Sequence, residues 1–279
     1  MRALLMAVAV MVAASMVAVG AAADGGGPSP GVSWGWDGVV APGGKVRYVA
    51  IPGNRDTLVE AVRMRGGRIL RWTSIPGTYG VPLVASDGSA GGLSNDGKTL
   101  VLTNGASPPG PRTTTLFVPV RTRTLTPRPV IVLPGSFSFD ALSPDASTLY
   151  LIQYSSARNY NRYRVRAYDL VAHKLLPGAI VDRREPDEVM AGVPVTRATT
   201  ADGQWAYTLY ARSSKPPFVH ALDTMGREAF CIDLPLHLDQ QRQMRLSLAL
   251  DGTQELRVRS GRTTVAVVDM QKLEARKGA

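Results

Sequence analysis

The sequence predicts an all-β fold, a β-propeller of five four-stranded antiparallel blades that follows an N-terminal signal peptide. One short phrase recurs about every 50 residues, and runs of alternating apolar and polar residues follow its copies. Repeats of 40 to 50 residues that each hold four strands are typical of propellers. Beyond the N-terminal segment, no stretch keeps a helical 3.6-residue period for more than about ten residues.

The first residues have the pattern of a secretory signal peptide, which we expect to occupy residues 1–23. Met1 and Arg2 form a short positive start, and residues 3–19 carry no charge. Three alanines at 21–23 match the small residues of a cleavage site. Cleavage would leave residues 24–33 as a flexible N-terminus. No cysteine lies near this site, so a lipoprotein anchor is not expected. An uncleaved anchor helix is the alternative.

The recurring phrase predicts the turn between the first two strands of each blade. Clear copies begin at Ser94, Ser143 and Thr200, and weaker copies begin at Ala41 and Ala249. The central Asp, or its Gly43 counterpart, recurs at spacings of 53, 49, 57 and 49 residues. Glycine adopts the positive φ that tight hairpin turns need, and aspartate accepts hydrogen bonds from nearby backbone N–H groups.

The remaining strands follow from the alternating runs. Third strands are expected at Tyr163–Tyr168, Phe218–Leu222 and Thr264–Val268, each followed by an aspartate, whereas the second unit has Arg121 in place of that aspartate. Fourth strands are expected at residues 129–133, 176–181 and 228–234.

We therefore expect one propeller domain over residues 34–271, with residues 34–40 supplying the first inner strand. Residues 272–279 are expected to form a C-terminal tail. A strand near residues 31–36 would complete the last blade and close the ring, because an open sheet edge is otherwise exposed. A β-sandwich is the structural alternative.

Composition limits the chemistry. The 279 residues include 32 Lys and Arg against 22 Asp and Glu, a net charge of +10. This charge suits an anionic partner such as nucleic acid, a membrane surface or a wall polymer. The alternative is coding bias, since only six of the basic residues are Lys and the arginines are scattered. Cys231 is the single cysteine, which excludes an internal disulfide and a cysteine-cluster metal site.

The candidate site residues lie in the loops opposite the Asp-Gly turns, around the expected central channel. Glu185, Asp187 and Glu188 belong to a charged loop, and Asp140 comes from another blade; a pair of these carboxylates could act as acid and base on a glycosidic bond. The alternative is a solvated loop that neutralises its own charges. The ligand-binding candidates combine aromatic and charged side chains: Tyr160, Arg162, Tyr163, Arg197 and Asp87. We expect no metal and no cofactor.

The repeats also resemble a known group of proteins. Ser143-Pro144-Asp145, then Thr148–Leu151 and Ala167–Leu170, are similar to the repeats of secreted YncE-type and TolB-type propellers. The resemblance covers most of residues 38–270. It implies a propeller fold and a binding or scaffold role, as in most members of those families. The matching residues are structural there, so the resemblance implies no catalytic residue.

Three functions are compatible with these observations. The first is a secreted, non-catalytic propeller that binds a protein, a peptide or a cell-wall glycan through its loop face. The second is an extracellular carbohydrate-active hydrolase or lyase, which needs two carboxylates roughly 5–10 Å apart across the channel. The third is a purely structural module. We expect a monomer that is secreted or associated with the cell wall, with no specific nucleic-acid partner and no membrane span after cleavage.

Overall fold

A computed structural model describes residues 34–104, 114–155, 162–186, 190–252 and 254–278. The expected signal peptide and residues 24–33 lie outside these residues. Over the described part of the chain, no helix has the length and apolar character needed to cross a membrane.

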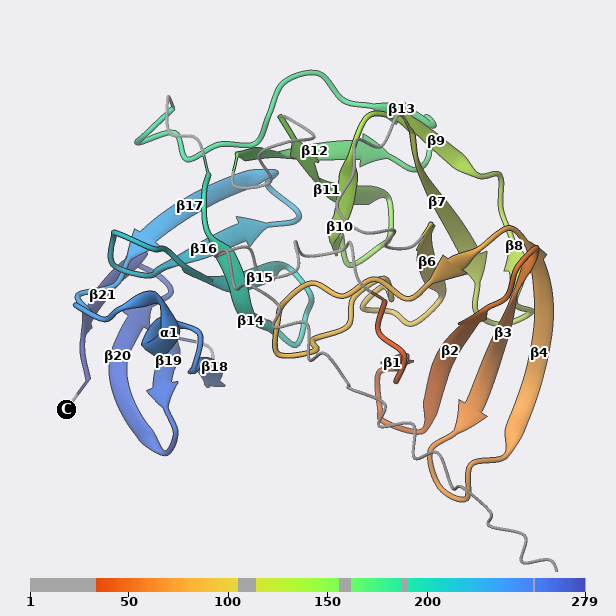
Figure 1. The fold of residues 1–279 in the computed structure, drawn as a ribbon, viewed down its shortest axis with the longest axis horizontal. Helices are drawn as coiled ribbons and strands as arrows, with labels where there is room; N and C mark the ends of the chain where they lie inside the picture. The colour runs from red at the N-terminus through yellow and green to blue at the C-terminus, as the bar shows by residue number, and fades with distance from the viewer. Residues whose placement is uncertain (1–33, 105–113, 156–161, 187–189, 253, 279) are drawn as a thin grey trace, which may run out of the picture.

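The structure is all-β, with five antiparallel sheets that follow one another along the chain (Figure 1). Blade one contains β1 (Val39–Val40), β2 (Val46–Pro52), β3 (Asp56–Arg63) and β4 (Ile69–Pro76). Blade two contains β5 (Tyr79–Gly80), β6 (Thr99–Asn104) and β7 (Thr114–Arg121), with the short strands β8 (Thr126–Pro127) and β9 (Ile131–Pro134) both paired to β7 at its outer edge.

Blades three to five have four strands each, as predicted. Blade three contains β10 (Phe137–Leu142), β11 (Thr148–Tyr154), β12 (Tyr163–Asp169) and β13 (Lys174–Leu175). Blade four contains β14 (Val193–Thr199), β15 (Trp205–Ala211), β16 (Phe218–Asp223) and β17 (Glu228–Asp233). After the short helix α1 (Gln240–Gln243), blade five contains β18 (Leu246–Asp251), β19 (Glu255–Ser260), β20 (Thr263–Asp269) and β21 (Glu274–Lys277).

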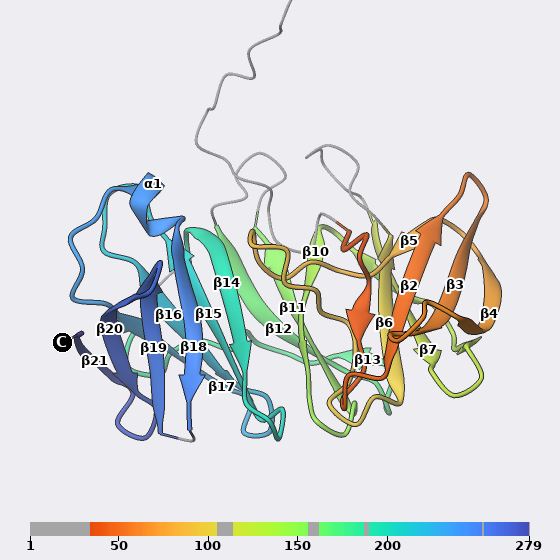
Figure 2. The same ribbon diagram turned by 90° about the horizontal axis from the view of Figure 1, so that it is seen from below.

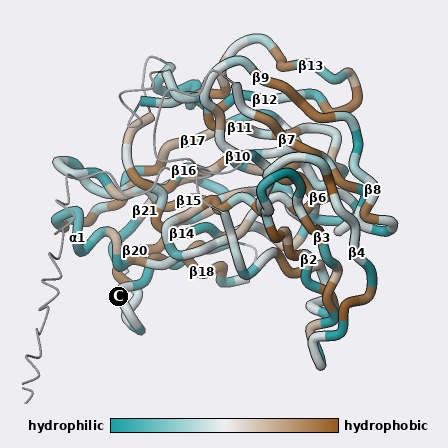
Figure 3. The backbone as a smooth tube through the Cα atoms, turned by 45° about the vertical axis from the view of Figure 1, so that its right-hand side comes forward, coloured by the Kyte–Doolittle hydropathy of each residue, from teal (hydrophilic) through white to brown (hydrophobic). Residues whose placement is uncertain are grey.

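Apolar packing joins each blade to the next. Alternate residues of a strand point to opposite faces of its sheet, so each blade can bury one face against each neighbour. Figure 3 shows hydrophobic stretches along many strands and hydrophilic stretches at several turns. Four buried clusters lie between successive blades, and examples of their members are Tyr48 and Leu100, Phe117 and Phe139, Tyr150 and Tyr210, and Leu209 and Val258.

The five blades form an arc in which blades one and five are the two ends (Figure 1). Among the described residues, no buried apolar cluster and no paired strands join blade five to blade one. The expectation that residues 272–279 form a tail is wrong, because β21 is the outer strand of blade five. An N-terminal strand is therefore not needed to complete that blade. Trp34 instead pairs with Pro82, beside blade two.

The three clear copies of the Asp turn are confirmed, and they share one set of hydrogen bonds. In blade two, Asp96 Oδ1 accepts from Ser94 Oγ at 2.6 Å and from Lys98 N at 2.9 Å, while Ser94 Oγ accepts from Thr99 N at 3.0 Å. The turns centred on Asp145 and Asp202 repeat this arrangement. These contacts are local in sequence, which is why the phrase predicts the turn. All three turns lie at one end of the blades, which we call the turn end (Figure 2).

An unpredicted hairpin crosses the axis of the arc. Residues 82–91 follow β5, and the hairpin is closed by pairing of Leu83 with Ala90. Its tip reaches β14 of blade four, where Ser86 N donates to Pro194 O and Asp87 N to Val195 O, both at 3.0 Å. Ser86 Oγ also donates to Pro194 O at 2.8 Å. The hairpin thereby ties blade two directly to blade four.

Two glycines, Gly88 within this hairpin and Gly92 directly after it, allow a test of how closely the base of the hairpin packs. Gly92 and Gly88 have nearly equal φ, +88° and +89°, but a Cβ on Gly92 would lie 2.5 Å from Val101 O, whereas a Cβ on Gly88 would meet nothing within 4 Å. We expect Gly88→Ala to lower the free energy of unfolding by about 1–2 kcal/mol, the cost of a left-handed residue. Gly92→Ala should lower it clearly further, because the backbone must also move. Urea denaturation measures both variants, and equal losses would contradict this packing.

Candidate functional site

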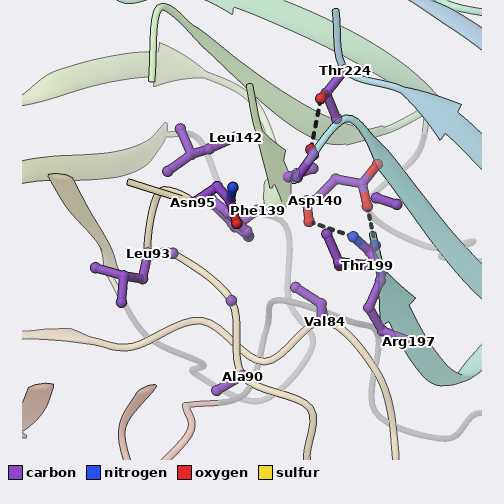
Figure 4. Close-up of a pocket in the computed structure, with 15 residues that line it drawn as sticks. Val84, Ala90, Leu93, Asn95, Phe139, Asp140, Leu142, Arg197, Thr199 and Thr224 are labelled. Carbon is purple, nitrogen blue, oxygen red and sulfur yellow. Dashed lines mark hydrogen bonds and ion pairs between the residues drawn. The ribbon is translucent and has the colours of Figure 1, made fainter. Parts of the chain in front are cut away.

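A pocket of about 130 Å³ lies near the axis, between the inner strands of blades two, three and four. Its wall includes Val84 and Leu93 from blade two, Phe139 and Asp140 from blade three, and Arg197 from blade four (Figure 4). At about 30 Å³ for each molecule, this volume holds roughly four waters. It is well below the roughly 300–1,000 Å³ of ordinary small-molecule sites.

A buried ion pair between Asp140 and Arg197 lies in the wall of this pocket. The Arg197 guanidinium donates to the Asp140 carboxylate and also to its backbone oxygen, the latter at 3.0 Å (Figure 4). Only 2% of the Asp140 side chain and 9% of the Arg197 side chain are exposed. Asp140 lies at an irregularity in the pairing of β10 with β11. Such bulges change the direction of a side chain, and this one turns the carboxylate toward blade four.

Several buried polar atoms around the pair lack a partner among the described residues. They include Asp140 Oδ2, Arg197 Nε, Thr208 Oγ1 and His220 Nε2. The register places Arg197 opposite Thr208 and Thr208 opposite His220, so three of them share one row across blade four. Unpaired polar atoms in a protein interior usually bond to ordered water. The row and the pocket together form a small polar interior beside the axis.

The structure brings Asp140 and Arg197 together, but it separates the other sequence candidates from them. Asp87 lies in the axis-crossing hairpin, where its carboxylate accepts from Ser89 N at 2.9 Å and Ser89 Oγ at 2.6 Å. Tyr163 is buried between Tyr154 and Tyr210. Burial raises its pKa well above the ordinary value. Its assignment as an exposed ligand contact is therefore wrong.

The charged loop lies away from the pocket in its described part. Asp182 pairs with Ala229 of β17, the outermost strand of blade four, and Glu185 is exposed just beyond it. Arg184 bonds Asp182, and Arg183 bonds Glu228 at 2.8 Å, as expected for a loop that neutralises its own charges. Arg162 is exposed. Tyr160, Asp187 and Glu188 lie outside the described residues.

The hydrolase or lyase alternative requires two facing carboxylates. Of the described residues that line the axial pocket, Asp140 is the one carboxylate, and it is bound to Arg197. These residues therefore form a buried ion pair and not an acid and base pair.

A basic surface at the turn end of blade one was missed by the sequence analysis. Lys45, Arg63, Arg65 and Arg68 are all exposed here, and we call this group the basic tip. Met64 N donates to Lys45 O at 3.0 Å, which brings the β1–β2 and β3–β4 turns together. Among the described residues, none of the four forms an ion pair. The segment Arg63-Met64-Arg65-Gly66-Gly67-Arg68 was the available signal, but its cations are not consecutive.

The free face of blade one is apolar beside this tip. Residues opposite to the buried face of the sheet are exposed here, among them Ile51, Ile69 and Trp72, the last of which is 66% exposed. The free face of blade five is different, because ion pairs such as Arg276 to Glu255 at 2.7 Å cover it. The two ends of the arc thus present different chemistry.

His220 supplies a pH test of the polar row. Burial lowers its pKa to about 4 from an ordinary 6.5, so the unfolded chain binds the proton more tightly. The contribution of neutral His220 to the free energy of unfolding is therefore complete above pH 6.5. It is lost as the pH falls to about 4, by roughly 3 kcal/mol at most. Urea denaturation across this window should show that slope, and His220→Gln should flatten it. The exposed His237 is the control, and a slope unchanged by His220→Gln would contradict the assignment.

Comparison with known proteins supports the fold and no more. The chain matches no protein-family model and no curated protein. Similar solved structures include hydrazine synthase from Kuenenia stuttgartiensis (16% identity, TM-score 0.51), which covers 84% of this chain and 64% of that one. They also include a TolB from Agrobacterium tumefaciens (12%, TM-score 0.44; 89% and 79% covered) and the Dos1 propeller (11%, TM-score 0.45; 86% and 57% covered). This chain therefore spans less than two thirds of the length of the hydrazine synthase chain and of the Dos1 propeller. TolB-type propellers are among its structural neighbours, and the YncE-type resemblance stays a prediction.

Proposed function

We propose that this protein is a secreted, non-catalytic propeller that binds a polyanionic polymer of the cell wall through the basic tip of blade one. The observation that carries the proposal is the unpaired positive charge of Lys45, Arg63, Arg65 and Arg68, all exposed at one end of one blade.

The charge is concentrated in this blade. Residues 34–76 contain seven Lys or Arg and three Asp or Glu, a net charge of +4 within the chain's +10. Some exposed basic residues elsewhere have carboxylate partners, such as Lys98 with Asp96 at 3.1 Å and Arg276 with Glu255, whereas others, such as Arg123, have none among the described residues. Cations without partners raise the local concentration of an anion most strongly.

The apolar neighbours of the tip add a second type of contact. Met64 is exposed between Arg63 and Arg65, Ile69 is exposed directly after Arg68, and Trp72 lies further along β4. A polymer with charged groups on a carbon backbone can bond the guanidinium groups and also cover these side chains. Arginine suits phosphate and carboxylate groups because its planar fork donates two parallel hydrogen bonds.

The test removes three charges of the tip together, with Arg63→Gln, Arg65→Gln and Arg68→Gln. Each cation near an anionic surface contributes about 1 kcal/mol, so the triple variant should bind roughly 100-fold more weakly at low salt. Immobilised long-chain polyphosphate is the defined probe, and sedimentation with cell-wall fragments is the second assay. Binding by the unmodified protein should also weaken between roughly 0.05 M and roughly 0.5 M salt, because salt screens exposed charges.

A matched control removes three exposed cations at the turn ends of blades two and three, with Lys98→Gln, Arg123→Gln and Lys174→Gln. This variant has the same net charge as the first but keeps the basic tip, and its binding should stay close to that of the unmodified protein. Equal losses in the two triple variants would show that total charge, and not this surface, governs binding.

A further inference from the structure

A second and larger cavity, of about 640 Å³, lies at the turn end between blades four and five. Its volume falls within the range of small-molecule sites. Blade four contributes Asp202, Trp205 and Tyr207, and blade five contributes Leu250, Met270 and Gln271. None of these residues belongs to the axial pocket or to the basic tip.

The aromatic wall of this cavity is held in place before any ligand arrives. The rings of Trp205 and Tyr207 are stacked, with centroids 5.9 Å apart and planes at 10°. The ring of Phe230 also packs against Trp205, with the two ring centroids 6.3 Å apart. Tyr207 is buried, whereas Trp205 is only partly buried and keeps some of its surface open at the cavity. A rigid aromatic surface loses little conformational entropy when a ligand binds.

The other clear copies of the Asp turn have no tryptophan at the position of Trp205. Thr99 and Thr148 occupy the equivalent position in blades two and three, where both are buried. The backbone N–H of all three residues makes the same hydrogen bond, to Ser94, Ser143 or Thr200. Trp205 is therefore an addition to the turn, and it lies where the cavity opens.

The polar groups of the wall suit an uncharged ligand with hydroxyl groups. The side-chain amide of Gln271 and the indole N–H of Trp205 make no hydrogen bond among the described residues. No Lys, Arg or His lines the cavity, although the chain as a whole is basic. The hydrogen bond from Thr200 lowers the pKa of Asp202, so this carboxylate is ionised and repels anions. Its Oδ1 is already bonded in the turn and the residue is exposed, which leaves little attraction for a cation.

From this arrangement we infer that the cavity between blades four and five binds an uncharged saccharide unit, with its ring against Trp205 and its hydroxyls bonded to Gln271 and Asp202. A sugar ring has an apolar C–H face and a polar rim. The cavity has the matching pair, an aromatic surface with Leu250 and Met270 beside it and amide and carboxylate groups at the edge. The inference is independent of the polyanion proposed for the basic tip.

The test is calorimetric titration of the protein with three neutral probes, namely chitotriose, cellotriose and maltotriose. At least one should bind, and Trp205→Thr, which introduces the residue found in blades two and three, should weaken that binding roughly tenfold or more. Because Trp205 also packs on the core, Gln271→Ala serves as the second variant. Its exposed, unbonded side chain can be removed without unfolding the protein, and a loss of several-fold is expected.

Two controls separate this site from the others. Trp72→Thr removes the exposed tryptophan of blade one, and the triple variant of the basic tip removes its charge; both should bind the saccharide normally. The inference is overturned if none of the three probes binds, or if Trp205→Thr and Gln271→Ala both bind as the unmodified protein does. If tetramethylammonium binds at Trp205 and the saccharides do not, the inference that the ligand is uncharged is overturned.

Discussion

The backbone hydrogen bonds from Ser86 and Asp87 to β14 connect blade two to blade four across the axis, and the shape of the arc depends on them. A sheet that is not covered on both faces exposes apolar surface, and five blades in an open arc have only four interfaces between them. Contacts at the axis must therefore do what ring closure does in a closed propeller. The Asp140–Arg197 ion pair adds a link between blades three and four, and Asn95 reaches Ala201 at 3.2 Å.

These axial contacts also explain why the centre of the molecule is a poor place for catalysis. The inner strands approach closely enough to leave roughly four waters, and the one carboxylate in the described wall is occupied by an arginine. Breaking such a pair leaves a charge without its partner in a nonpolar interior, which costs about 3–5 kcal/mol. The polar row that continues to His220 is consistent with a structural role, since its atoms lie between packed blades.

The two proposed binding sites lie instead where individual blades depart from the repeat. The Asp turn recurs with the same hydrogen bonds in three blades, and its aspartates serve the local backbone. Blade one adds unpaired arginines at its tip, and blade four adds Trp205 where blades two and three have threonine. A residue that the shared scaffold does not need is available for a partner. The two proposed sites use opposite chemistry, cationic at blade one and uncharged between blades four and five.

The sequence by itself determined the repeat, the turns, the strand order and the five blades, because each depends on contacts between residues close in the chain. The Asp turn involves residues up to five apart, and hairpin strands pair with their nearest neighbours. Only the tertiary structure decided how the blades meet. The partners Asp140 and Arg197 are 57 residues apart, and the candidate Tyr163 proved to be core because the neighbouring blade covers it. The open arc, the role of β21 and the cavity beside Trp205 likewise depend on packing between blades, for which no local pattern in the chain supplies a signal.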